Sequence, residues 1–562
     1  ADGALDCVVE GCEVAHVGDY GLWFRQGCRR NRLQHNRLFD LGVGGIRIGQ
    51  AGMPASDAVT SAENRVDNNH LFDGGHVYPA GVGIWVAQSY GNILSHNEIH
   101  DFNYSGMSIG WNWGDEPNRC HHNTIEFNHV HHVMKGVLSD GGAIYTLGTS
   151  PGSVIRNNVF HDVWPYHQPP LGWGIYLDAT TSGYLVENNL VYHTLSGGLM
   201  YSNGGHENTF RNNVFALPAN HVAWPCWEKR PNTFERNIVL FTQGTLFVPF
   251  SVHWVEERLK AGEPLGTWDR NVYWGPAGQE LRFHRRDLAA WQALGLDTHS
   301  VIADPGFADL AALDFSLKPD SPALRLGFQP LDTAKVGLYG DAAWVAEARA
   351  VKHPPTALPA PPPPPKPTPV QDDFEGTAVG LQPERVTVSG EAAEASIRVS
   401  DEVAAGGRHS LKVSDSAGLK HVWEPHLFYQ PHFTTGTVRQ SFELLLTPGA
   451  LLYTEWRDEG DYPQNVGPSV TFQGDGRVLV GDRIVARVPA DQWVRVELQA
   501  ALGKDVPRTF ALTLTPRGGT AQRLDALPFS GAAFRELHWL GFVSTAEAKT
   551  AFYLDDVSIT TP

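Results

Sequence analysis

Several residue types that mark other classes of protein are scarce in this chain. Lys135 is the only lysine before Lys229, and 43 Lys+Arg stand against 61 Asp+Glu, a net charge of −18. This balance argues against nucleic acid as a partner, because phosphate binding needs a basic face. No apolar run is long enough for a membrane span, so we expect no membrane insertion.

Cysteine is also scarce. The five cysteines have no paired metal-ligand spacing, and their odd number does not fit a disulfide framework. No signal peptide is visible, and the chain opens inside a strand-like pattern. We therefore expect the first domain to be incomplete at its N-terminus.

What the chain does contain is a repeat. An asparagine followed by alternating apolar residues recurs every 24 to 33 residues, at Asn36, Asn69, Asn97, Asn128, Asn158, Asn189, Asn213 and Asn237. A period of this length indicates a solenoid, and alternation indicates strands rather than helices. The sequence therefore predicts a parallel β-helix in which the asparagines form a ladder at one corner of the coils.

The amino-acid composition changes along the chain and indicates two domains joined by a linker. We expect both domains to be all-β. Residues 1–345 are predicted to form the β-helix. Residues 346–371 form a proline-rich linker, with ten prolines between 354 and 369. Residues 372–562 contain short alternating stretches separated by turns, which predicts an antiparallel, jelly-roll-like β-sandwich.

The coils differ in length at one corner. From the asparagine to the next glycine-led strand the gap is 10 residues in three coils and 15 to 17 in three others. Insertions on one side of a solenoid build a binding groove. Trp164 lies in one insert, and Trp111 and Trp113 lie in the coil of Asn97. Aromatic faces stack on sugar rings, so we expect these three residues to bind a saccharide.

Two acids lie beside this groove. Asp140 precedes the strand GAIYTL, and Asp178 ends the matching strand GIYLD one coil later. Two carboxylates are the minimum set for acid–base cleavage of a glycosidic bond. Asp-Gly is also a common turn pair, which would give Asp140 a purely structural role. The nearby side chains predicted to contact the substrate are Tyr145, Tyr176, Tyr201 and His206.

Histidines recur beside the ladder. The residues three positions after the asparagines include His100, His131 and His161, and His132 is in the fourth position. Because they alternate with inward apolar residues, we expect an exposed imidazole stripe. Such a stripe could hold a metal, orient a substrate or simply stack, and we favour orientation of the substrate. A solvated ladder is the alternative.

Two other functions remain open from the residues. A polysaccharide lyase or epimerase acting on uronates needs a strong base, and Lys135 lies in the insert beside Asp140. A non-catalytic polysaccharide-binding protein would have the same aromatic groove but would tolerate loss of either acid.

The segments DGGAIYTLG, GWGIYLD, ENNLVY and ENTFRNNVFA, with the later GLDTHSVIADPGF, resemble the β-helical glycoside hydrolases of family 141. The resemblance covers about residues 30–330, and residues 200–206 depart from the His-Tyr-Gly run of that family. It implies a right-handed β-helix and hydrolysis of plant cell-wall polysaccharide, as an α-L-fucosidase or xylanase. It also implies Asp140 and Asp178 as the catalytic acids, no catalytic cofactor, and an extracellular or periplasmic location. We expect a monomer.

The second domain resembles concanavalin-like or carbohydrate-binding modules. Its first and last strands carry acidic clusters, Asp372-Asp373-Phe374-Glu375 and Asp555-Asp556. If these strands are neighbours, Asp373, Glu375 and Asp556 could share a structural Ca²⁺, which prefers several oxygen ligands. Solvated charged edges are the alternative.

Overall fold

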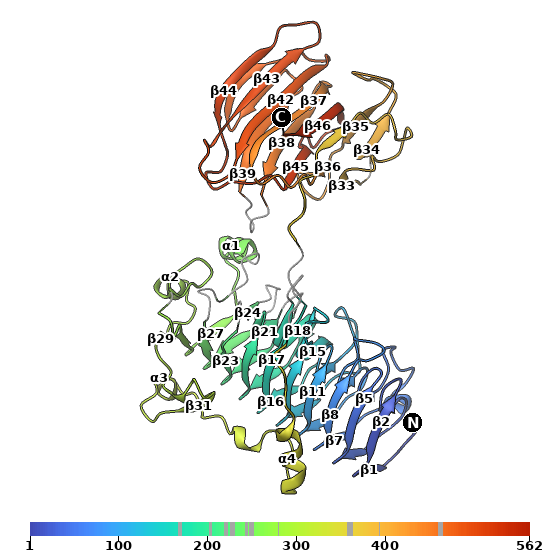
Figure 1. Cartoon of the computed structure of the whole chain (residues 1–562), viewed down its shortest axis with the longest axis vertical. Helices are drawn as coiled ribbons and strands as arrows, with labels where there is room; N and C mark the ends of the chain where they lie inside the picture. Colours follow the sequence, from blue (N-terminus) through green and yellow to red (C-terminus); the bar gives the residue numbers. More distant parts are fainter. Residues whose placement is uncertain are drawn as a thin grey trace. The chain divides into compact units, whose positions relative to one another are not determined.

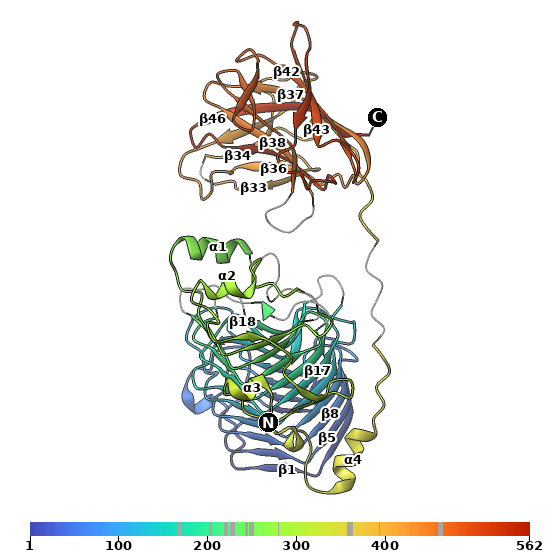
Figure 2. The same ribbon diagram turned by 90° about the vertical axis from the view of Figure 1, so that its left-hand side faces the viewer.

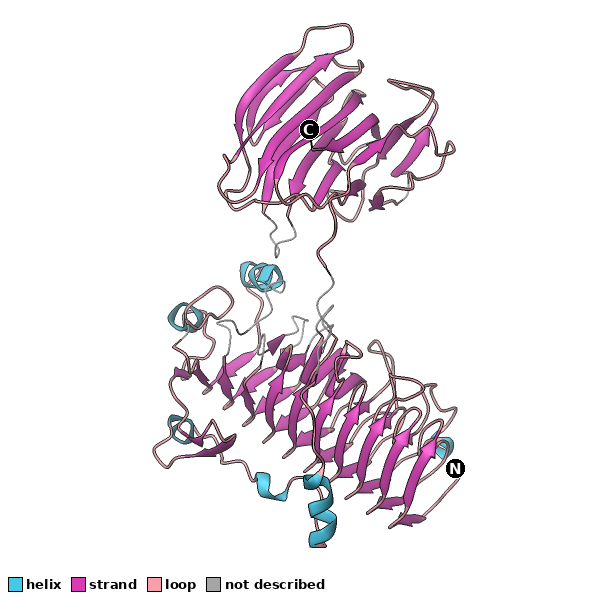
Figure 3. Cartoon of the chain, viewed as in Figure 1, coloured by secondary structure: helices cyan, strands magenta, loops and turns pink. Residues whose placement is uncertain are grey.

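The computed structural model describes residues 1–166, 171–201, 205–218, 223–224, 231–241, 246, 252–278, 280–356, 363–392, 394–458 and 465–561. The chain forms two compact units, Ala1–Pro362 and Pro363–Pro562, and strands dominate both (Figures 1 and 3). The all-β architecture predicted from the sequence is therefore confirmed.

The first unit is a parallel β-helix with three sheets along its length (Figure 2). Most coils contribute one strand to each sheet, so neighbouring strands in a sheet come from successive coils. Sheet 1 contains β1 (Val8–Glu10), β4 (Arg32–Gln34), β7 (Arg65–Asp67), β10 (Ile93–Ser95), β13 (Thr124–Glu126), β16 (Val154–Arg156), β19 (Leu185–Glu187), β22 (Thr209–Arg211), β25 (Thr233–Glu235) and β27 (Thr267–Asp269).

Sheets 2 and 3 complete each coil. Sheet 2 contains β2 (Glu13–Val17), β5 (Arg37–Leu41), β8 (His70–Gly74), β11 (Glu98–Phe102), β14 (His129–Val133), β17 (Val159–Val163), β20 (Leu190–Thr194), β23 (Val214–Ala216), β26 (Ile238–Leu240), β28 (Val272–Trp274) and β29 (Val301–Ile302). Sheet 3 contains β3 (Leu22–Phe24), β6 (Ile46–Ile48), β9 (Ile84–Val86), β12 (Met107–Ile109), β15 (Gly141–Thr149), β18 (Gly172–Ser182), β21 (Gly197–Tyr201) and β24 (Ala223–Trp224).

The predicted asparagine ladder holds the coils in register. Each side-chain amide donates to the amide oxygen of the next asparagine at 2.9–3.3 Å, from Asn36 through to Asn271. The same oxygens accept backbone N–H groups, for example that of Asn97 on Asn128 at 3.1 Å. The residue before each ladder position turns the corner with a positive φ, as at Phe127 (φ 56). The ladder thus gives the buried side-chain amides of its own asparagines hydrogen-bond partners at every step.

A second ladder at another corner was not predicted. Asn31, Asn64, Asn92 and Asn123 are linked in the same way at 2.9–3.3 Å. Each of these asparagines precedes a residue of the first ladder by five positions, so the signal was present in the sequence.

Apolar side chains, which alternate with outward-pointing residues along each strand, fill the interior of the coils. Ile99, Val130, Phe160 and Val191 occupy equivalent positions on sheet 2 and are fully buried. Their neighbours along each strand consequently lie on the outer face of the sheet.

Short elements interrupt or follow the coils. They are η1 (Asp57–Val59) between β6 and β7, α1 (Val252–Lys260) between β26 and β27, and α2 (Leu288–Gln292) between β28 and β29. After β29 come the antiparallel pair β30 (Phe307–Asp309) and β31 (Asp314–Leu317), then α3 (Pro322–Arg325), η3 (Thr333–Lys335) and α4 (Ala342–Ala350). No helix among the described residues is long and apolar enough to cross a membrane.

The segment from 322 to 356, here called the strap, runs back along the β-helix. The Gln329 N–H donates to Asn212 Oδ1 (2.6 Å), the Gly337 N–H to the Phe127 carbonyl (2.8 Å), and the Tyr339 N–H to Asn68 Oδ1 (3.0 Å). The contacts thus pass to progressively earlier coils. The predicted linker was to begin at residue 346, but α4 continues to Ala350 and stays on the β-helix.

The second unit is an antiparallel sandwich, as predicted. Sheet 4 contains β32 (Val370–Asp372), β34 (Ser396–Ser400), β35 (Ser410–Asp415), β37 (Gly436–Leu446), β42 (Val494–Leu502), β43 (Thr509–Pro516), β44 (Gln522–Pro528) and β46 (Thr550–Thr560). Sheet 5 contains β33 (Thr387–Ser389), β36 (His426–Tyr429), β38 (Leu451–Arg457), β39 (Val466–Gln473), β40 (Arg477–Val480), β41 (Arg483–Arg487) and β45 (Trp539–Ser544).

Candidate active site

The outer face of sheet 3 carries the two predicted acids. Tyr145 of β15 pairs in register with Tyr176 of β18, and both lie outside the coil, because Ile144 and Ile175 beside them fill the core. Asp178 follows two positions after Tyr176 and therefore points to the same face. Asp140 stands just before β15, in a turn with φ 63 that aspartate tolerates.

The acids and the tyrosines are joined crosswise between the two strands. The Tyr145 hydroxyl donates to Asp178 Oδ2 at 2.7 Å, and the Tyr176 hydroxyl donates to Asp140 Oδ1 at 2.8 Å. The two phenol rings meet edge to face with centroids 4.9 Å apart. Each carboxyl group is thus positioned by a hydroxyl from the neighbouring coil.

The electrostatics of the two acids differ. Asp178 is 4% exposed, whereas Asp140 lies at the exposed edge of the strand. Partial burial of the Asp140 carboxyl raises its pKa above the usual value, and the charge of Asp178 raises it further, while the Tyr176 hydrogen bond opposes the rise. Burial and the two carboxylates also raise the pKa values of Tyr145 and Tyr176. The tyrosines are therefore neutral donors near neutral pH.

Tyr104 is a site residue that the sequence analysis missed. Its hydroxyl donates to the Asp140 carbonyl at 2.5 Å, and the charges of Asp140 and Asp178 contribute to its raised pKa, after burial. It lies in the connection after β11, with no motif of its own, so only the packing of neighbouring coils brings it to the acids.

The aromatic residues predicted for this groove lie at different depths. Trp111 packs edge to face on Trp85 at 4.9 Å and is 37% exposed, and Trp113 beside it is 63% exposed. Trp164 instead donates to Asp162 at 3.3 Å, at the corner towards sheet 2. His206 is mostly buried, with its ring 3.9 Å from Asp115 of the Trp111 loop.

The structure contradicts the prediction for Tyr201. This residue is 1% exposed and lies inside the coil, where its ring contacts Phe210 at 4.8 Å. It pairs in register with Leu177, an inward residue, so the strand alternation places it in the core and away from any substrate.

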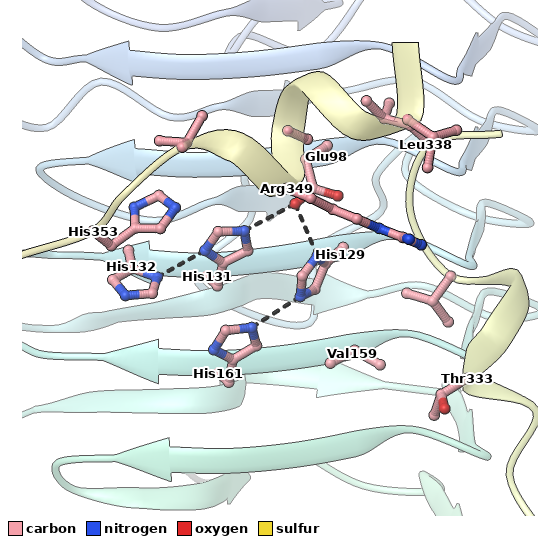
Figure 4. Close-up of a pocket in the computed structure, with 14 residues that line it drawn as sticks. Glu98, His129, His131, His132, Val159, His161, Thr333, Leu338, Arg349 and His353 are labelled. Carbon is pink, nitrogen blue, oxygen red and sulfur yellow. Dashed lines mark hydrogen bonds and ion pairs between the residues drawn. The ribbon is translucent and has the colours of Figure 1, made fainter. Parts of the chain in front are cut away.

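The histidine stripe lies on sheet 2, separate from the acids. His100, His131 and His161 stack with centroids 4.8–5.1 Å apart, and the stack continues through Phe72 and Phe39 on one side and Tyr192 on the other. The residues point outwards as expected, but they are not exposed: His100 is 0%, His131 5% and His161 9% exposed. The strap covers them, which the sequence analysis did not foresee (Figure 4).

Burial under the strap lowers the pKa values of several imidazoles of this region. Desolvation, together with the neighbouring imidazoles, lowers the pKa of His70 to about 3 and that of His132 to about 4. Desolvation also lowers the pKa of His161 to about 4, although its hydrogen bond to Asp162 acts in the opposite direction. Three more residues of this region were missed by the sequence analysis: Glu98, His129 and His353.

In the second unit, the predicted neighbours do pair. β32 and β46 are antiparallel partners. The Glu375 carboxylate accepts the N–H groups of Arg408 and His409, both at 2.7 Å, and Asp373 accepts the N–H of Glu375 at 3.1 Å. Asp556 lies beside Gly406. The Ca²⁺ site at Asp373, Glu375 and Asp556 stays a prediction.

Comparison with known proteins supports the winding of the first unit. Residues 59–239 match the family described as a right-handed β-helix region, in agreement with the predicted hand. A search of curated proteins finds no match.

Similar solved structures include a glycoside hydrolase, with 22% identity over 42% of this chain and a TM-score of 0.34. The matched region spans 37% of that hydrolase. Two others are an endo-β-1,4-glucuronan lyase from Trichoderma reesei (12% identity, 31% of this chain, 90% of that chain, TM-score 0.24) and a xylan-binding domain from Paenibacillus barcinonensis (16%, 32%, 86%, 0.19).

Proposed function

We propose that this protein is a glycoside hydrolase acting on plant cell-wall polysaccharide, with Asp140 and Asp178 as its catalytic residues. The observation that carries the proposal is the crossed arrangement of two carboxyl groups and two tyrosine hydroxyls on one face of adjacent coils. The resemblance to family 141 assigns the same two acids.

Asp140 is the general acid in this proposal. A carboxyl group that donates a proton to the leaving oxygen must hold that proton near the working pH, and burial together with the nearby charge of Asp178 raises the pKa of Asp140. Asp178, held by Tyr145, is the nucleophile or the base that activates water. Trp111 and Trp113 offer exposed rings on which a sugar could stack.

A lyase that uses Lys135 as its base has less support. The Lys135 ammonium pairs with Asp101 at 3.2 Å, among the groups of sheet 2. A base must reach the proton that it removes, and Lys135 is engaged away from Asp140.

The test is product release from fucosylated pectin, xylan and polyuronates. Wild type would be compared with Asp140→Asn and Asp178→Asn, following reducing ends and ultraviolet absorbance together. We expect reducing ends without absorbance, and a loss of about 10²–10⁴-fold in each variant, the range for removing a general acid or base. Asp73→Asn, at a corner of sheet 2, is the matched control and should keep full activity.

Three results would refute the proposal. Unsaturated, absorbing products would replace the hydrolase with a lyase. Full activity in both folded variants, or polymer binding without any cleavage, would leave the two acids with a structural role.

A further inference from the structure

The strap and sheet 2 enclose a cavity that the proposed hydrolase does not use. Its volume is about 300 Å³, and imidazoles of β14 and β17 line it together with Glu98, Arg349 and His353 (Figure 4). We call it the histidine pocket.

In two imidazoles of this pocket, a neighbouring carboxylate determines which ring nitrogen carries the hydrogen. His129 Nδ1 lies 2.8 Å from Glu98 Oε1, and His161 Nδ1 lies 2.6 Å from Asp162 Oδ2. An ionised carboxylate only accepts hydrogen bonds, so each Nδ1 carries the hydrogen. In a neutral imidazole the other nitrogen, Nε2, then presents a lone pair.

Those two lone pairs face one another. The Nε2 atoms of His129 and His161 are 2.9 Å apart. Two acceptors at this distance repel, unless both face a positive centre: a proton shared between them, or a metal ion to one side that both nitrogens bind.

The surrounding groups match a metal site. Metal-bound histidines usually donate their second ring N–H to a carboxylate, as His129 and His161 do here. A ring nitrogen of His131 lies within 4.8 Å of the other two. His131 also bonds Glu98, at 2.9 Å. Neutral imidazoles suit Zn²⁺, Cu²⁺ and Ni²⁺ rather than Ca²⁺ or Mg²⁺.

We propose that the histidine pocket binds one divalent transition-metal ion of the Zn²⁺ class through the Nε2 atoms of His129 and His161, with His131 packed beside them and bonded to Glu98. Glu98 and Asp162 orient the rings. The ion would link two successive coils beneath the strap. Its role is structural, because it lies on sheet 2 whereas both proposed catalytic acids lie on sheet 3.

The test uses the full chain, freed of metal by a chelator and then titrated with Zn²⁺ in a calorimeter. We expect about one ion per chain and a higher melting temperature with Zn²⁺, because a ligand of the folded state stabilises it. His129→Ala and His161→Ala should bind on the order of 100-fold more weakly, and Asp162→Asn about 10–100-fold more weakly. His299→Ala, whose exposed ring pairs with Asp269 at 2.8 Å, is the control and should bind as wild type.

Circular dichroism of each variant separates a lost ligand from a lost fold, and Asp162→Asn keeps all three imidazoles if an alanine variant does not fold. Absence of stoichiometric binding by folded wild type would overturn the proposal and assign a shared proton to the pair. Unchanged affinity in His129→Ala and His161→Ala would overturn it as well.

Discussion

Two outer faces of the same β-helix differ in what closes them. On sheet 3, Asp140 and Asp178 are held by tyrosines from adjacent coils, and the nearby loops belong to those same coils. On sheet 2, the stacked histidines are covered by the strap, whose His353 lies more than 190 residues after His161 in the sequence.

The same physical cause has opposite effects on the two faces. Burial disfavours the charged form of any group, so it raises the pKa of Asp140 and lowers that of His70. Burial thus favours the neutral form on both faces: the protonated carboxyl group of Asp140 on one and the unprotonated imidazole of His70 on the other. The strands of the β-helix determine the direction in which each side chain points, and burial determines which protonation state is favoured.

The largest effect should come from breaking the asparagine ladder, which holds together the coils that carry both faces. Asn128→Ala removes the acceptor of the Asn97 N–H and side-chain amide, together with donors to Leu94, Glu126 and Asn158. Each buried group left without a partner costs about 1–3 kcal/mol, so we expect a loss of roughly 3–5 kcal/mol in the free energy of unfolding. Denaturant titration measures it. Asn103→Ala, which removes one bond to Gly75, is the control and should cost about 1 kcal/mol.

Lowering the pH should change the free energy of unfolding in opposite directions through the two faces. His70 has its pKa lowered to about 3 by burial, with His100, Arg37, Glu98 and Glu347 around it. Between pH values of about 6.5 and 3 the unfolded chain binds a proton that the folded chain refuses, so stability falls as the pH falls through this window. The free energy of unfolding should drop by about 1.4 kcal/mol for each pH unit in this window, a few kcal/mol in all.

His70→Phe should flatten that decline, whereas His299→Phe, at an exposed ring, should not. For Asp140 the sign is reversed, because a raised folded-state pKa gives stability below the unfolded pKa that is lost as the pH rises through the folded one. Unfolding of wild type and both variants across this pH range checks the result. An equal slope in wild type and His70→Phe would contradict it.

Tyr176→Phe should lower activity at Asp140 and Asp178 on sheet 3 and leave the histidines of sheet 2 unaffected. It removes the hydroxyl that positions Asp140. Hydrogen bonds to charged groups contribute about 1.5–3 kcal/mol, so we expect kcat/KM to fall about 10–100-fold. The hydroxyl also lowers the pKa of Asp140, so the alkaline limb of the pH–rate profile should move upwards in the variant. Tyr192→Phe, whose ring ends the histidine stack on sheet 2, is the matched control. A fall in rate without movement of the limb would argue against Asp140 as the acid.

Sequence alone predicts what repeats and what is local. The ladder of Asn36 to Asn237 and the strands of Tyr145 and Tyr176 follow from alternation, since each coil meets the same neighbours. The alternation along the strands also indicated that Tyr201 points inwards, because it is the register partner of the inward residue Leu177. The prediction nevertheless placed Tyr201 in the site. The asparagines at five-residue spacing were visible too.

The burial of the histidines could not be predicted in this way. It depends on where Trp344 and His353 return to the β-helix, and those contacts join residues with no periodic relation. Alternation correctly gave the outward direction of His131, but outward on a solenoid means exposed only where nothing lies on top.

The smallest effect should come from loosening the strap at its end. His353 stacks on His132 with centroids 4.0 Å apart and lies 3.1 Å from Asp101. An aromatic pair contributes about 0.5–1.5 kcal/mol, so His353→Ala should cost about 1 kcal/mol, seen as faster hydrogen exchange confined to residues 342–356. Activity at Asp140 and Asp178 should stay unchanged, because these acids belong to sheet 3. A parallel loss of activity would instead mean that the strap reaches the catalytic face through the shared coils, and that the two faces are one coupled system.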